Sequence, residues 1–380
     1  MGRLSSVLPV APIAILGGGV AGLCAARLLH AARVPFVLLE ARDRLGGRVL
    51  TVDATGAPAD NGFDLGASWF WPRTQPRLAA LVAELGLSAF VQLTDGDVLF
   101  ERMVREGPQR YHGGPQQALS FRLAGGSAAL VRALAAGLPR ERLRLRTAVT
   151  GMQLEDNGVT LMLAAQGDAS SSPERITVSH VIAALPPRLL GATVTFAPTL
   201  DADTLAAWHD VPTWMAPHAK FFALYDRPFW REAGLSGTAQ SMVGPLAEIH
   251  DATTASGQAA LLGFVGVGAE QRAAVGDMVL TRACEEQLRR LFGDEARRPQ
   301  ATLLKDWAAD PFTATPADRV PGGHPAGGDR RWVTGLWERH LTLGGSEVSP
   351  LEPGYLAGAV LAAERAASAA IAAIQERRGT

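Results

Sequence analysis

The most constraining feature of this chain is a glycine-rich turn near its start. The run Gly17-Gly18-Gly19-Val20-Ala21-Gly22 has the pattern G-x-G-x-x-G and follows a short apolar segment, residues 13–16. Such a segment predicts a strand buried on both faces, and the composition of residues 23–32 predicts a helix after the turn. In a strand–turn–helix unit this pattern permits a tight turn, close approach of the backbone to a pyrophosphate, and phosphate binding at the helix N-terminus.

A carboxylate follows at the position where a dinucleotide site needs one. Residues 34–39 predict a second buried strand, and Glu40 ends it, 18 residues after Gly22. A carboxylate there can accept hydrogen bonds from the hydroxyls of the adenosine ribose. The alternative is a glycine-rich turn in a sheet protein that binds no ligand. Because Glu40 and the strand–turn–helix–strand order occur together, we favour a dinucleotide-binding α/β domain.

A second glycine–arginine turn indicates which dinucleotide is bound. Arg44-Leu45-Gly46-Gly47-Arg48 comes just after Glu40 and Arg42. Two arginines beside a flexible glycine pair can hold a pyrophosphate bidentately, which a nicotinamide enzyme has no evident need to do. At this point the chain resembles the flavin-containing amine oxidase family, whose N-terminus carries G-x-G-x-x-G, a ribose glutamate and R-x-G-G-R. The resemblance implies FAD as the cofactor.

The resemblance extends along the chain and implies further cofactor contacts. Residues 63–69 resemble the family's D-L-G-x-x-W segment, Val149 matches a valine that pairs with adenine, and residues 345–347 and 354–359 resemble the closing turn and the last helix. The family's glutamate in that helix is Ala357 here. The implied cofactor residues are Gly17, Gly19, Val20, Ala21, Gly22, Glu40, Arg42, Gly47, Arg48, Gly66, Ala67, Ser68, Trp69, Val149, Trp307, Gly345, Glu347, Tyr355 and Leu356.

Lysine is almost absent from this chain. Of its 36 basic residues two are lysines, Lys220 and Lys305, and 34 are arginines, a bias that codon usage explains. Lys220 begins a segment, residues 220–230, that resembles the family strand whose lysine lies near flavin N5. The resemblance therefore implies that Lys220 is catalytic, relaying a proton and helping to activate dioxygen. Without it, Lys220 is an ordinary solvent-facing lysine, as we interpret Lys305.

The substrate pocket is only partly defined by the resemblance. Trp307 matches a family tryptophan beside the flavin, Tyr355 is the one obvious member of the family's aromatic cage, and we add Phe264 to the pocket. Residues 313–318 replace the segment that carries the second cage aromatic or a flavin-binding cysteine, so we expect non-covalent FAD and a differently shaped pocket. Glu248 and Asp251 either line this pocket or belong to a solvated turn, and we favour the turn.

These residues predict a flavin-dependent amine oxidase. Hydride passes from the amine to flavin N5, the imine is hydrolysed to an aldehyde or ketone, and dioxygen becomes hydrogen peroxide. The alternatives within the fold are an amino-acid oxidase and a C–H desaturase; an alternative of another class is a non-catalytic binding protein of the GDP-dissociation-inhibitor kind. The resemblance implies a mixed α/β fold of the amine-oxidase or glutathione-reductase type. We expect a discontinuous Rossmann-like FAD domain (1–73, 122–200 and 325–380) and a substrate domain (74–121 and 201–324).

Composition limits the partners and the compartment. The 36 basic and 37 acidic residues leave a net charge of −1, which argues against nucleic-acid and membrane partners. The resemblance implies a small-molecule amine and O2 as partners. The eight histidines show no metal-ligand spacing, so we expect no metal. Two cysteines form no disulfide framework, which favours a soluble cytoplasmic protein. Whether it is a monomer or a homodimer stays open.

Local patterns predict several other elements. A hairpin is expected at 157–158, strands at 175–184, 221–225, 260–266 and 341–343, and helices from Asp201 and over 278–292 and 354–374. Loops are expected at 168–173 and 321–329.

Overall fold

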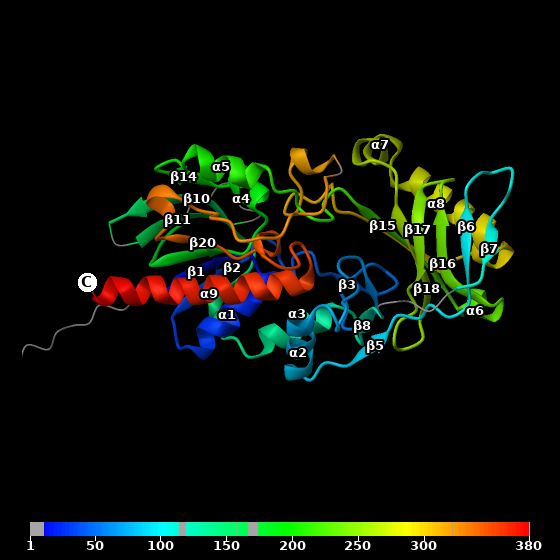
Figure 1. Ribbon diagram of the computed structural model, residues 1–380, viewed down its shortest axis with the longest axis horizontal. Helices are drawn as coiled ribbons and strands as arrows, with labels where there is room; N and C mark the ends of the chain where they lie inside the picture. Colours follow the sequence, from blue (N-terminus) through cyan, green and yellow to red (C-terminus); the bar gives the residue numbers. More distant parts are fainter. Residues whose placement is uncertain (1–10, 114–118, 157, 166–173, 321, 380) are drawn as a thin grey trace, which may run out of the picture.

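The computed structural model describes residues 11–113, 119–156, 158–165, 174–320 and 322–379. Figure 1 shows two lobes side by side, one built around a five-stranded sheet and the other around a seven-stranded sheet. The strands of the first sheet fall in the ranges expected to bind FAD, and those of the second in the ranges expected to bind substrate. The domain boundaries themselves stay a prediction.

The five-stranded sheet is parallel and begins with the glycine-rich unit. Its order is β20 (Leu341–Leu343), β13 (His180–Ala183), β1 (Ile13–Leu16), β2 (Phe36–Leu39) and β9 (Leu143–Arg144). Helix α1 (Val20–Ala31) starts directly after Gly19 and packs against α9 (Leu356–Gly379), which runs along this lobe in Figure 1. The pairing of β20 with β13 confirms that a strand from far along the chain closes this sheet.

One expected strand is wrong, because residues 175–184 form two strands in two sheets. β12 (Glu174–Val178) lies in a four-stranded sheet of order β12, β11 (Gly158–Ala165), β10 (Thr147–Glu155) and β14 (Thr195–Ala197). β13 crosses to the five-stranded sheet, and the N–H of Ser179 between them donates to the carbonyl of Pro12 at 2.9 Å. β12 is mostly exposed, as an edge strand of the four-stranded sheet can be. β13 is buried throughout, as an inner strand of a parallel sheet should be.

Other expected elements are confirmed. β10 and β11 pair as antiparallel arms around the predicted hairpin; residue 157 lies outside the described residues. Helix α5 (Ala202–His209) is capped by Asp201, whose carboxylate accepts from the N–H of Thr204 at 2.9 Å. Residues 322–329 have no regular helix or strand, as expected, and residues 168–173 lie outside the described residues.

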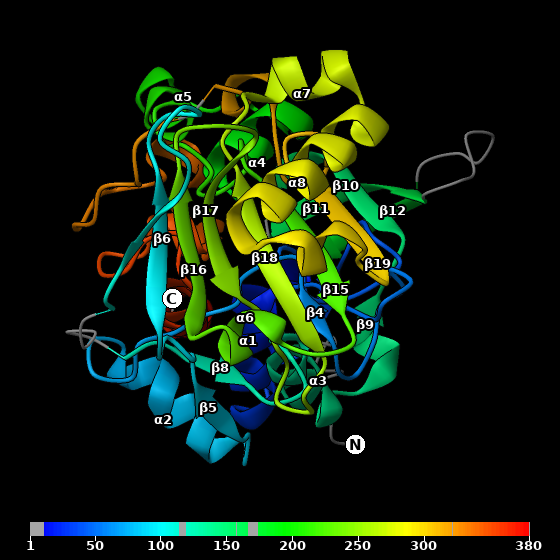
Figure 2. The ribbon, with the colours of Figure 1, turned by 90° about the vertical axis from the view of Figure 1, so that its right-hand side faces the viewer.

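The seven-stranded sheet forms the second lobe. Its order is β19 (Ala301–Asp306), β15 (Ala219–Tyr225), β18 (Ala259–Val265), β17 (Leu246–Asp251), β16 (Leu235–Ser241), β6 (Asp97–Glu101) and β7 (Gln109–Tyr111). Helix α8 (Asp277–Phe292) lies across one face of it, as Figure 2 shows. Leu280, Cys284 and Leu288 of this helix pack with Phe221 and Leu261 of the sheet, so burial of this face anchors α8.

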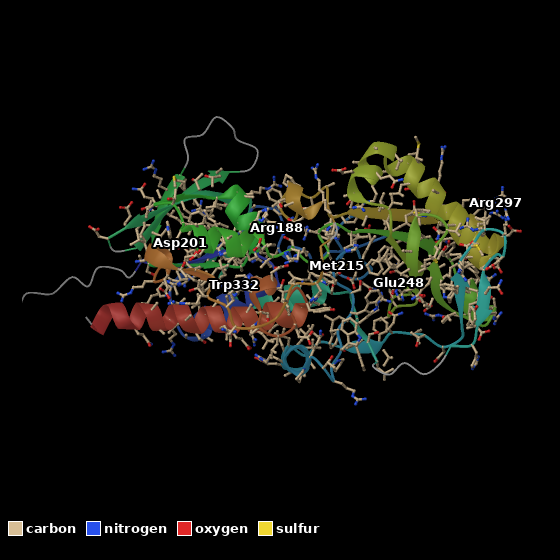
Figure 3. The ribbon with its side chains drawn as sticks, turned by 45° about the horizontal axis from the view of Figure 1, so that its top comes forward. Arg188, Asp201, Met215, Glu248, Arg297 and Trp332 are labelled. Carbon is tan, nitrogen blue, oxygen red and sulfur yellow. The ribbon has the colours of Figure 1, made fainter. Side chains whose placement is uncertain are left out.

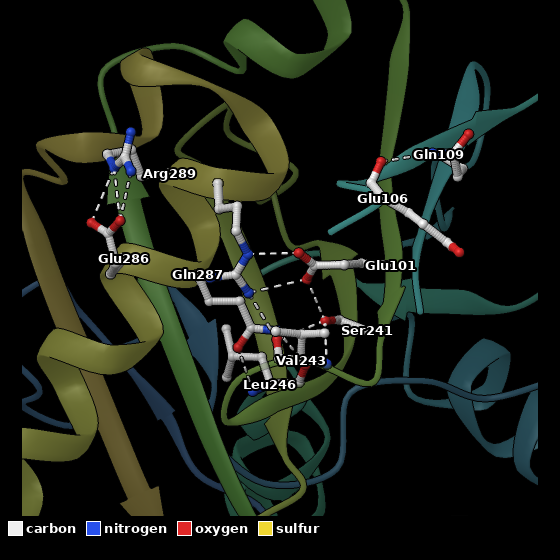
Figure 4. Close-up of polar contacts among 10 residues, drawn as sticks. Glu101, Glu106, Gln109, Ser241, Val243, Leu246, Glu286, Gln287 and Arg289 are labelled. Carbon is white, nitrogen blue, oxygen red and sulfur yellow. Dashed lines mark hydrogen bonds and ion pairs between the residues drawn. The ribbon is translucent and has the colours of Figure 1, made fainter. Parts of the chain in front are cut away.

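A buried polar network adds to that packing (Figure 4). Arg290 of α8 bonds both carboxylate oxygens of Glu101 at 2.6 and 3.0 Å, and the hydroxyl of Ser241 donates to the same carboxylate at 2.7 Å. The side chain of Gln287 bonds both the N–H and the carbonyl of Leu246 at 2.7 Å. These contacts fix α8 relative to β6, β16 and β17.

Short elements complete the chain. They are β3 (Thr51–Val52), β4 (Phe63–Asp64), α2 (Pro76–Glu84), β5 (Ala89–Val91), β8 (Phe121–Leu123), α3 (Ala128–Ala136), α4 (Pro187–Thr193), α6 (Phe229–Glu232) and α7 (Ala269–Val275), with 3-10 turns at 140–142, 294–297, 316–318, 335–337 and 346–348. Helices α2 and α5 contribute to the two cores of the first lobe.

Helix α9 is the longest helix of the described chain. Its stretch Leu356–Gln375 is long and apolar enough to cross a membrane by length and composition. Half of that stretch is buried within the protein, where Val360, Ala363 and Ala367 share a core with α1. A buried core helix passes the same test of length and composition, so this helix alone is weak evidence for a membrane span.

Candidate functional site

A cavity of about 530 Å³ opens where the two lobes meet. One end lies at the carboxyl ends of parallel strands, where Leu16, Leu39 and Ala184 follow or end β1, β2 and β13. In open α/β sheets this edge is where ligands bind. The other end reaches Lys220 of β15 and Phe264 of β18. Met215, labelled between the lobes in Figure 3, also lines it.

Most of the residues selected from the sequence lie on this cavity. The lining includes Gly17, Gly19, Val20, Ala21, Glu40, Arg42, Gly47, Arg48, Gly66, Ala67, Ser68, Trp69, Val149, Lys220, Phe264, Trp307, Tyr355 and Leu356. Gly22, Gly345 and Glu347 do not line it. A Cβ on Gly22 would lie 1.9 Å from the carbonyl oxygen of Gly17, and one on Gly345 would lie 2.5 Å from that of Leu185. These two glycines therefore allow close backbone packing behind the cavity.

Glu40 stands at the nucleotide end. One carboxylate oxygen accepts from the N–H of Gly18 at 2.6 Å and the other from the N–H of Arg42 at 2.8 Å. The side chain of Arg42 pairs with Asp310 at 2.6 Å and bonds the hydroxyl of Thr313 at 3.0 Å. A carboxylate has about four lone-pair sites, so Glu40 keeps acceptor capacity for the hydroxyls of a ribose.

The two arginines of the second turn have different roles. Arg48 lines the cavity and bonds both oxygens of buried Glu347 at 2.5 and 3.0 Å, the hydroxyl of Ser346 at 3.1 Å and the carbonyl of Trp214 at 3.2 Å. Arg44 does not line the cavity, and its guanidinium donates to backbone carbonyls of its own turn, at Leu45, Gly47 and Val49. The expectation that both arginines bind pyrophosphate is therefore wrong for Arg44. Glu347, which does not line the cavity, contributes by holding the Arg48 side chain.

The nucleotide end fits a dinucleotide cofactor. A Cβ at Gly19 would meet only the carbonyl oxygen of Gly46, at 3.8 Å, so the cavity side of this backbone is open to a close ligand. Val20 and Ala21 line the cavity in the first turn of α1, and Leu356 does so in the first turn of α9. Neither first turn carries an acidic residue. Two helix N-termini thus face the cavity, which favours negative charge on the ligand.

Lys220 is buried at the opposite end. Its Nζ donates to the carbonyls of Gly66 at 2.6 Å and Asp64 at 3.2 Å, and to the hydroxyl of Ser68 at 2.8 Å. Burial lowers the pKa of Lys220 to about 7; the Asp64 carboxylate raises this pKa and Arg122 lowers it. The side chain can therefore exchange a proton near neutral pH. Ser68, expected as a cofactor residue, also contacts Lys220 through its hydroxyl.

Trp307 directly follows β19, the strand that pairs with β15, and its backbone N–H donates to the carbonyl of His218 at 3.1 Å. Its indole N–H donates to the carbonyl of Leu65 at 2.9 Å, which fixes the ring against the 64–68 turn. Nζ of Lys305 lies 4.6 Å from the centroid of this ring and pairs with Asp310 at 2.9 Å. Lys305 is thus an ion-paired, largely buried residue, and its interpretation as an ordinary surface charge is wrong.

Sequence reasoning missed two aromatic walls of the pocket. The Trp71 ring meets Tyr355 edge-on with centroids 6.1 Å apart, and Trp214 lies 6.3 Å from Tyr355; both tryptophans line the cavity. Trp71 follows Trp69 by two residues in the turn that resembles the family segment, which was a usable signal. Trp214 precedes Lys220 in a segment without a recognisable pattern. From the sequence, Tyr355 is the one obvious member of the aromatic cage, and these two tryptophans supply further aromatic walls beside it.

Glu248 and Asp251 do not line the cavity. Both lie on strand β17, so their assignment to a solvated turn is also wrong. Asp251 is buried and accepts from the indole of Trp230 at 2.8 Å and from Arg231 at 2.6 Å. Glu248, labelled in Figure 3, bonds His250 at 2.7 Å, and the His250 ring packs on Trp69 behind the cavity wall.

Comparison with known proteins places this geometry in a family. The family described as flavin containing amine oxidoreductase matches residues 20–122 and 109–371. A Mycobacterium tuberculosis protein named as the flavin-containing monoamine oxidase AofH is 26% identical, over 94% of this chain and 95% of its own length. The human flavin-containing amine oxidase B is 42% identical over 20% of this chain and 14% of the human protein.

Solved structures share the fold over almost the whole chain. A putrescine oxidase with putrescine bound superposes with a TM-score of 0.72 at 20% identity, covering 95% of this chain and 99% of that protein. A cyclohexylamine oxidase from Brevibacterium oxydans gives a TM-score of 0.76 at 20% identity, covering 97% of this chain and all of that protein. At this identity the likeness establishes the architecture alone.

Proposed function

The chain belongs to the flavin-containing amine oxidoreductases, and from this premise we propose that it binds FAD non-covalently and oxidises the C–N bond of an amine with dioxygen as acceptor. The observation that carries the proposal is the buried amine of Lys220, placed in the same cavity as the nucleotide-binding turn. This family match also sets aside the non-catalytic binding protein that the sequence left open.

A flavin bound in this cavity would supply a hydride acceptor for the amine carbon and a route for those electrons to dioxygen, with hydrogen peroxide as the product. The residues of the chain supply the surroundings. Trp71, Trp214 and Tyr355 hold the amine and keep water from its carbon. Lys220 takes up or gives a proton at Nζ, since burial has lowered its pKa to about 7. The imine product is then hydrolysed to an aldehyde or ketone.

Non-covalent binding is supported by the positions of the cysteines. Cys24 and Cys284 are the two cysteines of the chain, both are buried, and neither lines the cavity. Burial raises the pKa of each thiol to about 12, so neither is a reactive thiolate. Acid precipitation of the purified protein should therefore release all of the flavin into the supernatant. Flavin retained in the pellet would contradict this part of the proposal.

The charges on the cavity support an amine with a single nitrogen and an apolar body. Of the described residues that line the cavity, Glu40 is the one carboxylate, and it lies at the nucleotide end. Arg42 and Arg48 are committed to Asp310 and Glu347. A second ammonium or a substrate carboxylate among the aromatic walls would lose its water without a free partner. We therefore place diamines, polyamines and amino acids below monoamines as substrates.

Three substrates that share five methylenes test this proposal. Hexylamine, 1,5-diaminopentane and 6-aminohexanoate differ only in a terminal methyl, ammonium or carboxylate group. Each is mixed anaerobically with the purified flavoprotein, and loss of the oxidised flavin band is followed in a stopped-flow spectrometer. We expect hexylamine to reduce the flavin, with the two charged analogues slower by about 100-fold or more.

The outcomes separate the activity from its specificity. Reduction by 1,5-diaminopentane as fast as by hexylamine would contradict the proposed substrate class but not amine oxidation. Reduction by polyenes and by no amine would overturn amine oxidation itself in favour of a desaturase. Peroxide formed in stoichiometric amounts on readmission of air identifies dioxygen as the acceptor. The cytoplasm stays our proposed location, which fractionation of the source cells tests.

A further inference from the structure

The amine of Lys220 lies in a cradle made by one short turn. Its Nζ contacts three oxygen atoms, the carbonyls of Asp64 and Gly66 and the hydroxyl of Ser68, at 3.2, 2.6 and 2.8 Å. All three come from residues 64–68, which run from the last residue of β4 into the turn after it. Trp69 and Phe264 close the remaining sides, with ring centroids 5.5 and 5.4 Å from Nζ. The number of oxygens equals the number of N–H groups on an ammonium.

The three oxygens differ in what they can do. A carbonyl only accepts a hydrogen bond, whereas a hydroxyl can accept one or donate one. A protonated lysine has three N–H groups and needs three acceptors. A neutral lysine has two N–H groups and a lone pair, and so needs two acceptors and one donor. Rotation of the Ser68 hydroxyl satisfies either state without moving Nζ.

We propose that Ser68 is a positioning residue for Lys220, whose hydroxyl accepts a hydrogen bond from the ammonium and donates one to the amine. Nζ thus keeps one position at the cavity wall in both protonation states. A proton can then enter or leave Lys220 without a change of its rotamer. The inference rests on the proposed function for its catalytic meaning, because that function assigns proton transfer to Lys220.

None of the described charged or titratable groups around Lys220 hydrogen-bonds its Nζ as the Ser68 hydroxyl does. The nearest charges are the Asp64 carboxylate and the Arg122 guanidinium, which act on Lys220 through space. His250 lies behind Trp69 and Phe264. Lys305, opposite Lys220 on β19, bonds Asp310, and His218 precedes Lys220 on the cavity wall. Of the described side chains, Ser68 is the one with a polar atom bonded to Nζ.

The scarcity of lysine makes a direct test practical. Protein grown with lysine labelled by carbon-13 at Cε gives signals from two lysines, Lys220 and Lys305. A Lys305→Met variant assigns them. The Cε shift of Lys220 is then followed against pH in the flavoprotein, which reports its protonation without any turnover. Wild type is compared with Ser68→Ala, Ser68→Thr and Ser68→Cys.

We expect Ser68→Ala to move the titration midpoint of Lys220 by about one pH unit toward acid. The direction follows because the ammonium loses a charge-assisted hydrogen bond and the amine loses only a neutral one. Ser68→Thr, which keeps the hydroxyl, should titrate as wild type, and Ser68→Cys should lie between. Ser346→Ala removes another cavity hydroxyl, one that bonds Arg48 instead, and should leave the Lys220 midpoint in place.

Two results would overturn the proposal. One is a Lys220 midpoint that stays where it is in Ser68→Ala; the other is an equal shift in Ser346→Ala. If Ser68→Ala does not fold, the Lys220 midpoints of Ser68→Thr and Ser68→Cys are compared instead. Equal midpoints in these two variants would contradict a dependence on the hydroxyl. Failure of the amine panel to reduce the flavin contradicts the proposed function and leaves the titration result unaffected, so the two failures are distinguishable.

Discussion

Replacing Lys220 by methionine should change how the stability of the protein depends on pH. Burial lowers the pKa of Lys220 to about 7 in the folded protein, against an ordinary value of 10.5 in the unfolded chain. Between these pH values the unfolded chain binds one more proton than the folded protein. Wild-type stability therefore rises with pH over this window, by up to about 1.4 kcal/mol per unit from this group.

The magnitude follows from the width of the window. Because the slope is half maximal at the folded pKa, the two pH units from pH 7 to pH 9 correspond to roughly 2 kcal/mol of added stability. Methionine cannot titrate, so the variant lacks this contribution. The loss of bonds to Gly66, Asp64 and Ser68 adds a cost to the variant that does not depend on pH. The free energy of unfolding of Lys220→Met should therefore compare most favourably with that of wild type at pH 7 and below. The difference should shift in favour of wild type as pH rises.

The assay is equilibrium unfolding in urea at several pH values and fixed flavin concentration, followed by tryptophan fluorescence. Groups that do not interact with Lys220 titrate alike in both proteins, so their contributions cancel in the difference. Lys305→Met is the matched control, because it removes the other lysine of the chain, which is a quarter exposed and paired with Asp310. A wild-type and Lys220→Met difference that is constant from pH 7 to pH 9 would refute the reasoning.

Three other predictions concern the cofactor site and the reaction. Arg48→Ala leaves the fully buried carboxylate of Glu347 without its cation and should cost about 3–5 kcal/mol of unfolding free energy, with lower flavin content; Arg48→Lys should cost less, and equal losses would contradict the bidentate pair. Gly22→Ala places a Cβ 1.9 Å from the Gly17 carbonyl oxygen and should destabilise by about 1–3 kcal/mol in the same assay, whereas Gly137→Ala, with open space around it, should stay within about 0.5 kcal/mol. Lys220→Met should retain flavin but slow its reoxidation by dioxygen in stopped flow; reoxidation at the wild-type rate would remove the proposed role of Lys220.

Much of the nucleotide end could be predicted from sequence because its features are local. The Gly17–Gly22 turn needs neighbouring residues only, and Glu40 follows the next strand along the chain. The hairpin of β10 and β11 and the cap at Asp201 are equally local. Their periods and turn residues carry the information within about 20 residues.

The errors share a different origin. Residues 174–183 have strand composition throughout, and their division between two sheets depends on what packs above each half. Arg44, Lys305 and Asp251 are charged residues whose partners come from their own turn or from elements that composition does not place. A sequence shows that a side chain is charged, but its burial and its partner are tertiary properties.

The sequence by itself determined the parallel sheet with its dinucleotide turn, the resemblance to a flavin enzyme, and Lys220 as one of two lysines available for catalysis. Tertiary structure alone decided that the turn at residues 64–68 surrounds Nζ of Lys220, and that Trp71 and Trp214 complete the wall beside Tyr355. The physical reason is separation along the chain: Ser68 and Lys220 lie 152 positions apart, and only the packing of the two lobes brings them within 2.8 Å.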